Sequence, residues 1–156
     1  MTQTETKAEP TFRSACADGR WEGVDLLAYK AEADAPFKDI TRQVLFHTAD
    51  LGCELRYFEV AAGGHSTLER HEHVHAVMIL RGAGRCLVGE EVRDIGLHDL
   101  VSIPPFTWHQ FRASRQGPLG FLCMVNKQRD RPQLPSDAEL SAMRRNAAVA
   151  AFLDGE

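Results

Sequence analysis

Four side chains of the types that bind metal ions occur at alternate positions of one short stretch. They are Glu69, His71, His73 and His75. Two apolar residues, Val77 and Ile79, continue the same alternation. Alternate side chains of a β-strand point to one face, so the spacing predicts one strand over 69–82 with a polar and then an apolar face. Three imidazoles and a carboxylate on a buried face need partners, and a cation supplies a shared one. We therefore predict a metal site; the alternative is a solvated strand end with incidental histidines.

A second segment carries a further candidate ligand, His109. A metal held by one strand alone would be weakly fixed, so a ligand from a distant segment is expected. His109 follows a predicted strand over 99–104 and a proline turn, and it begins another strand. In a small barrel this strand can bring His109 alongside His71 and His75, which is the three-nitrogen arrangement of sites that leave positions open for substrate. Taken alone, His109 is better explained as a core histidine hydrogen-bonded to the backbone, and the histidines of the first stretch reverse that preference.

Size and composition exclude several classes of protein. At 156 residues with a formal net charge of −4, the chain is about one domain long and has no basic stripe that would indicate a nucleic-acid partner. The stretch 1–9 is polar, unlike a signal peptide, and there is no run of about 20 apolar residues to span a membrane. The sequence therefore predicts a soluble, cytoplasmic protein. Four widely separated cysteines argue against a zinc ribbon or a disulfide scaffold. They are Cys16, Cys53, Cys86 and Cys123.

Short apolar stretches separated by turns predict the elements that position these residues. The expected strands are 41–47, 54–60, 69–82, 85–88, 92–95, 99–104, 108–113 and 119–125. The pair Gly63-Gly64 is expected to end the second of them. Many short strands with glycine, proline and acidic turns are typical of an all-β sandwich or barrel.

The character of the chain changes after Asn126. A charged, proline-punctuated linker is followed by Ser136 and Glu139, which form a capping box before an alanine-rich helix reaching about Leu153. We expect this helix to pack on the barrel exterior or on a second subunit. The predicted organisation is an N-terminal extension over 1–36, a β-barrel over 37–126, and a linker and C-terminal helix over 127–156.

The two candidate ligand stretches resemble the two motifs of the cupin superfamily, commonly written G-x5-H-x-H-x3,4-E-x6-G and G-x5-P-x-G-x2-H-x3-N. The first is matched by Gly63-x5-Glu69-x-His71-x3-His75-x6-Gly82. In the second, His98 and Phe106 stand where glycines are usual, Pro104 and His109 are kept, and Ala113 replaces the asparagine. The resemblance implies a small double-stranded β-helix, or jelly-roll, barrel.

The register of the first motif implies a ligand set. Glu69 occupies the position of the usual first histidine and His75 that of the usual glutamate, so acid and imidazole have exchanged places. A register that pairs His71 with His73 leaves no carboxylate at the expected position. The implied metal ligands are Glu69, His71, His75 and His109, with His73 as a neighbouring acid or base. Manganese, iron, nickel and zinc all suit such ligands.

A closer resemblance extends over the stretches 68–78, 103–112, 120–126 and 129–135. They are similar to a small bacterial cupin group that includes the methylthioxylulose-5-phosphate sulfo-lyase, which yields deoxyxylulose phosphate and methanethiol. The resemblance implies a manganese-type site that stabilises an enolate, and a phosphorylated ketose as substrate. His73 would supply the proton at carbon. Either Cys123 or an external thiol such as glutathione would attack the sulfur, although Cys123 is better explained as a buried apolar residue.

Two other classes of function are compatible with such a site. One is an iron-dependent dioxygenase acting on a small thiol or enediol, and the other is a non-catalytic cupin that binds a small molecule. A cupin of the second class that senses a small molecule would need a DNA-binding segment, and the predicted C-terminal helix, which stands alone, does not supply one. The resemblance also implies a homodimer, because cupins often pair through edge strands.

Overall fold

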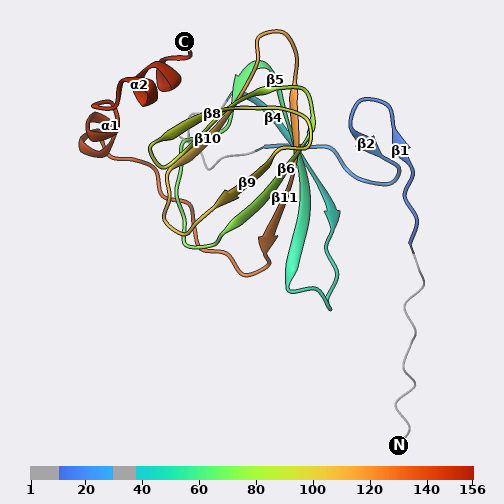
Figure 1. Ribbon diagram of the computed structural model, residues 1–156. Coiled ribbons are helices and arrows are strands. Elements are labelled where there is room, and N and C mark those ends of the chain that lie inside the picture. Colours follow the sequence, from blue (N-terminus) through green and yellow to red (C-terminus); the bar gives the residue numbers. More distant parts are fainter. Residues whose placement is uncertain (1–10, 30–37) are drawn as a thin grey trace, which may run out of the picture.

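The computed structural model describes residues 11–29 and 38–156, which form a curled antiparallel sheet flanked by two short helices (Figure 1). The strands are β1 Ala15–Cys16, β2 Arg20–Trp21, β3 Leu27–Ala28, β4 Lys38–Phe46, β5 Cys53–His65, β6 His75–Arg81, β7 Gly84–Val88, β8 Glu91–Ile95, β9 Leu100–Ile103, β10 His109–Ala113 and β11 Leu119–Asn126. The helices are α1 Asp137–Met143 and α2 Ala147–Asp154. The prediction of an all-β barrel is confirmed.

The long strand β5 organises the sheet. The strands follow the order β8-β7-β10-β5-β11-β6-β9, and β4 pairs with β5 from the other side. Alternate residues of these strands point inward and fill the barrel with apolar side chains. The core includes Ile40, Phe58, Val60, Val77, Ile79, Phe111, Phe121 and Val125. This packed interior makes the barrel a rigid support for side chains at its open end.

The described part of the N-terminal extension packs on the outer face of the barrel. The ring of Trp21 meets that of Tyr57 edge-on at 5.2 Å, and the side-chain amide of Gln43 donates to the carbonyl of Gly19 at 2.8 Å. The rest of the extension, residues 1–10 and 30–36, lies outside the described residues, and so does the polar stretch 1–9. Among the described residues there is no helix long and apolar enough to span a membrane.

Strand β5 and the C-terminal helix differ from the predicted elements. Strand β5 continues through Gly63-Gly64 to His65, because Gly63 adopts a positive φ of 71° and its N–H still bonds Ser114. The predicted single helix is two helices, since the side chain of Asn146 caps the amides of Ala148 and Val149 and starts a new helix there. The capping box of Ser136 and Glu139 is confirmed.

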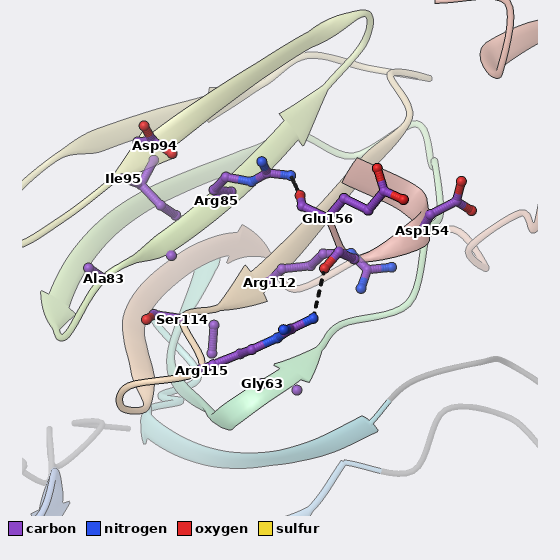
Figure 2. Close-up of a pocket in the computed structure, with 14 residues that line it drawn as sticks. Gly63, Ala83, Arg85, Asp94, Ile95, Arg112, Ser114, Arg115, Asp154 and Glu156 are labelled. Atoms are coloured by element: carbon purple, nitrogen blue, oxygen red, sulfur yellow. Dashed lines mark hydrogen bonds between the residues drawn. The ribbon is translucent and has the colours of Figure 1, made fainter. Parts of the chain in front are cut away.

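Helix α2 docks on the barrel through buried apolar residues and three arginines. Val149 and Phe152 pack against Leu68 and Leu87. Arginine side chains then donate to backbone oxygens at the end of the helix. Arg85 donates to Glu156 and Arg115 to Gly155 (Figure 2). Arg112 donates to Leu153. Cationic groups at a helix C-terminus stabilise its unpaired carbonyls. The cavity of about 790 Å³ beside these arginines contains none of the candidate site residues.

We expect the substitution Phe152→Ala to lower the free energy of unfolding by about 3 kcal/mol. The ring of Phe152 is fully buried, and the guanidinium groups of Arg85 and Arg112 lie 5.6 and 5.3 Å from its centroid. Urea unfolding of the two proteins measures the difference. Leu153→Ala, a neighbouring position that is only partly buried, is the control. Equal losses for both variants would contradict the docking described here.

Candidate metal centre

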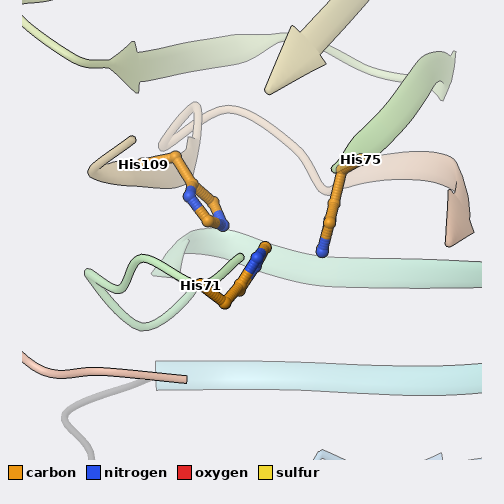
Figure 3. A group of neighbouring side chains, drawn as sticks. All are labelled: His71, His75 and His109. Carbon is orange, nitrogen blue, oxygen red and sulfur yellow. The ribbon is translucent and has the colours of Figure 1, made fainter. Parts of the chain in front are cut away.

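Three histidines from separate segments meet at one end of the barrel. His75 begins β6, His109 begins β10, and His71 lies in the loop before β6. One nitrogen of each ring lies within 4.8 Å of a nitrogen of the other two. Figure 3 shows the rings turned toward a common point. The fold thus assembles His71, His75 and His109 into one cluster.

Hydrogen bonds fix which nitrogen of the His71 and His109 rings faces the cluster. The Nδ1 atom of His71 lies 2.7 Å from the carbonyl oxygen of His73, and Nδ1 of His109 lies 2.9 Å from that of Thr107. Because a carbonyl only accepts, both Nδ1 atoms carry the proton and both Nε2 atoms have a free lone pair. The Nε2 atoms of His71 and His75 are buried without a hydrogen-bond partner. Buried lone pairs without a donor are what metal ligands present, so these residues fit a divalent ion.

Burial keeps the cluster in the neutral form that binds metals. It lowers the pKa of His109 to about 4, and it lowers the pKa of His71 and of His75 below the ordinary range of histidine. The neighbouring histidines add to the shift in each case, because two imidazolium ions repel each other. At neutral pH all three rings are therefore deprotonated and ready to bind a cation.

The pKa of His109 predicts a pH dependence of stability in the metal-free protein. The unfolded chain binds a proton at His109 below about pH 6.5, whereas the folded chain does so only below about pH 4. This residue therefore lowers stability progressively as the pH falls through that window, by up to about 3 kcal/mol. Glu69 acts in the opposite sense, since burial raises the pKa of its carboxyl to about 7.

The difference between variants separates these two contributions. Urea unfolding in EDTA at pH 7.5 and pH 4.5 is compared for the parent protein and for His109→Gln. We expect the variant to lose less stability on acidification than the parent protein. An identical change in both proteins would contradict this expectation, because it would mean that His109 binds its proton as readily in the folded chain as in the unfolded one.

The predicted strand over 69–82 is wrong in its first half. Strand β6 begins at His75; residues 71–74 form a bend, and Glu69 and Arg70 make only isolated bridges. The reason is that the carboxylate of Asp130 accepts hydrogen bonds from the backbone amides of Glu72 and His73, at 2.7 and 3.1 Å. Amides bound in this way cannot join a ladder. The loop, rather than strand alternation, brings His71 to His75.

Glu69 lies beside the cluster without joining it. Its backbone pairs with His109 in both directions, at 3.2 and 3.0 Å, which sets both side chains on the same side of the bridge. Its carboxylate is not one of the ligand atoms within 4.8 Å of one another. A role for Glu69 as a fourth metal ligand stays a prediction.

The two predicted catalytic residues flank the cluster. The ring of His73 stacks on that of His71, with centroids 3.6 Å apart and planes 5° from parallel. The Sγ atom of Cys123 lies 3.1 Å from Nδ1 of His75 and 3.9 Å from the guanidinium of Arg56. Burial raises the pKa of the Cys123 thiol, and the charge of Arg56 opposes that shift.

Sequence reasoning missed one residue of the site, Asp130. It lies in the segment interpreted as a linker, yet its Oδ1 atom is 2.6 Å from Nδ1 of His73. The available signal was the charged run Arg129-Asp130-Arg131, within one of the stretches that carried the closer resemblance. Arg56, whose side chain is buried among Glu54, Phe58 and Cys123, received no role either.

Two residues that replace glycines of the second motif adopt backbone conformations that favour glycine. His98 and Phe106, which stand where glycines are usual, have φ values of 70° and 53°. These lie in the left-handed region that glycine adopts without strain and that costs other residues about 1 kcal/mol. The turn geometry is thus kept although the glycines are absent, and His109 still enters the site from it.

The histidines of two strands and of a preceding loop gather at one end of an antiparallel barrel. This arrangement defines the cupin class. A model of the cupin domain matches residues 56–125. A curated protein of Rhodospirillum rubrum, 1-methylthio-D-xylulose 5-phosphate methylsulfurylase, is 57% identical over 152 residues, which are 97% of each chain. The chain therefore belongs to the cupin family.

Solved structures agree with this assignment. The crystal structure of a cupin 2 conserved barrel domain protein from Rhodopseudomonas palustris is 58% identical, with a TM-score of 0.87 over 91% of this chain and 98% of that one. A cupin-2 domain structure from R. rubrum is 60% identical, with a TM-score of 0.84 over 92% and 97% of the two chains.

Proposed function

We propose that the protein acts on 1-methylthio-D-xylulose 5-phosphate, breaking its carbon–sulfur bond to give 1-deoxyxylulose 5-phosphate. The observation that carries the proposal is the near full-length identity of 57% to the methylsulfurylase, together with a three-histidine cluster flanked by a thiol and a further histidine. A divalent ion held by His71, His75 and His109 would supply a positive charge against an enolate oxygen. Manganese is favoured, and iron, nickel or zinc would suit the same nitrogens.

The reaction requires a thiol as electron donor. A thiolate attacks the substrate sulfur and forms an S–S bond; the C1–S bond breaks, and its electron pair moves onto carbon as an enolate. A proton then adds to C1. The products are the deoxyketose phosphate and a methyl disulfide of the thiol, and a second thiol would release methanethiol from that disulfide.

Cys123 and glutathione are the two candidates for the thiol. Cys123 is buried, and its sulfur lies beside His75 and Arg56, either of which can stabilise a thiolate. An external thiol would leave Cys123 as the hydrogen-bond partner that orients His75. The two are separated by a single turnover without added thiol, because attack by Cys123 leaves a methylthio group on the protein that mass spectrometry detects.

His73 is the residue that we propose as proton donor to C1. Its ring lies against that of His71, so it is next to the cluster where the substrate would bind. Its Nδ1 atom is engaged by Asp130, which leaves Nε2 for the substrate.

Product analysis tests the function. Metal-loaded protein is incubated with the methylthioketose phosphate and glutathione in deuterium oxide, and the products are followed by NMR. We expect deoxyxylulose phosphate with solvent deuterium in its new methyl group. The His109→Gln variant is the control for uncatalysed reaction. Intact substrate after incubation with the loaded parent protein would overturn the proposal.

An iron-dependent dioxygenase and a non-catalytic binding cupin are the alternatives. The first would consume oxygen in proportion to substrate, which an oxygen electrode measures. The second would bind the ketose without converting it. Neither function requires a thiol or a proton donor beside the cluster, so these two residues favour the carbon–sulfur lyase reaction.

We also propose a cytoplasmic homodimer. Glutathione is kept reduced in the cytoplasm, and the four cysteines are free. The end strand β9 pairs Leu100 with Met78 of β6, and these side chains are 74% and 38% exposed. An open edge with apolar side chains favours pairing with a second copy.

We expect Leu100→Glu to convert this dimer to a monomer in light scattering after gel filtration. Leu51→Glu, an exposed position in the turn between β4 and β5, is the matched control and should leave the mass unchanged. Equal masses for the parent protein and the Leu100 variant would contradict an interface at β9.

A further inference from the structure

The carboxylate of Asp130 binds the loop that carries two histidines of the site. One oxygen lies 2.7 Å from the amide nitrogen of Glu72, and the other lies 3.1 Å from the amide and 2.6 Å from the ring nitrogen Nδ1 of His73. A charged carboxylate can only accept hydrogen bonds, so His73 donates from Nδ1. This contact fixes both the rotation of the ring and the nitrogen that carries its proton.

The orientation of His73 is further set by its contact with His71. Only 7% of the His73 side chain is exposed, and its ring lies flat on that of His71. The backbone of His73 in turn accepts the Nδ1–H of His71 at 2.7 Å. The carboxylate of Asp130, the ring of His73 and the ring of His71 therefore form one connected unit.

A second contact joins the same two segments. The backbone of Arg70 pairs with that of Gln133 in both directions, at 3.1 and 2.8 Å. The guanidinium of Arg70 binds the side chains of Gln133 and Glu139, each at 3.0 Å, and stacks over Trp108 at 4.3 Å. The segment after β11 is thus held against the histidine loop independently of Asp130.

This second contact separates two roles that Asp130 could have. If Asp130 only held the loop in place, the contacts of Arg70 would largely compensate for its loss. If it orients His73, no other described residue replaces it, because Nδ1 of His73 has only Asp130 as a hydrogen-bond partner among those residues.

We propose that Asp130 is a positioning residue that holds His73 in the tautomer protonated at Nδ1, with Nε2 directed to the substrate. The proposal rests on the proposed function for the role of His73, but the tautomer itself does not depend on the substrate. The segment predicted as a linker is, on this account, part of the active site.

The test compares Asp130→Asn, Asp130→Glu and the control Asp137→Asn. Asp137 lies in the same segment, and its carboxylate makes no hydrogen bond or ion pair within the described part of the chain. NMR of protein with ¹⁵N-labelled histidine reports the tautomer of each ring, and His73→Gln identifies the His73 signals. Bound metal, kcat and KM are measured on the same samples.

We expect Asp130→Asn to shift His73 away from the Nδ1–H tautomer and to lower kcat on the order of 10- to 100-fold, with KM and bound metal nearly unchanged. Asp130→Glu should restore part of kcat, and Asp137→Asn should match the parent protein. An unchanged tautomer in Asp130→Asn, or a loss of metal and folding in place of the kcat effect, would overturn the proposal. If the tautomer shifts as expected while no protein converts the ketose, the proposed function fails and the positioning role stands.

Discussion

The substitution His71→Gln is expected to remove the bound divalent ion and the activity together. His71 supplies a buried Nε2 atom without a hydrogen-bond partner, and its orientation is fixed by the bond from Nδ1 to the backbone. Loss of one of three nitrogen ligands should weaken metal binding by more than about 100-fold, which is the upper range for residues that only support a ligand. Activity should then fall to the level of the uncatalysed reaction.

Metal content after dialysis, measured by mass spectrometry, checks this expectation. The control is His47→Gln, because His47 is exposed and its ring pairs with Glu54, outside the cluster. The control should keep its metal and its activity. Stoichiometric metal in the His71 variant would mean that the three histidines are not the site.

The substitution His73→Gln is expected to retain the metal and to lower kcat by about 10²- to 10⁴-fold, which is the usual contribution of a general acid or base. Glutamine keeps a polar side chain of similar length but cannot transfer a proton. The Nδ1 atom of His73 is engaged by the carboxylate of Asp130 at 2.6 Å, and the ring lies beside the cluster of His71, His75 and His109.

Metal content and steady-state kinetics of the same preparation check the His73 variant. Loss of metal together with rate would point to a second possible cluster, formed by His71, His73 and Asp130, whose ligand atoms also lie within 4.8 Å of one another. In that case His73 would be a ligand, and the proton at carbon would have another source.

The spacing in the sequence predicts the barrel and the placing of His75 and His109 at the starts of strands, because strand alternation and the second motif are local signals. The inward face of β6 follows the alternation from His75 to Val77 and Ile79, as expected. The histidine loop could not be predicted in this way. Its shape depends on Asp130, 57 residues from His73 in the chain, and no local pattern reports such a contact.

Two other differences from the predicted elements have separate causes. The break between α1 and α2 depends on one capping asparagine in a stretch whose composition favours a continuous helix. The position of Glu69 depends on a backbone bridge to His109, which forms only once β10 has folded against the loop. The first of these features has a local cause, and the second depends on a contact between distant segments.

The most direct test of the metal centre is an anomalous-difference map from crystals of the manganese-loaded protein. The account predicts one peak among the Nε2 atoms of His71, His75 and His109, with Glu69 beside it if the carboxylate completes the site. A peak among His71, His73 and Asp130, or none in a fully loaded crystal, would contradict it.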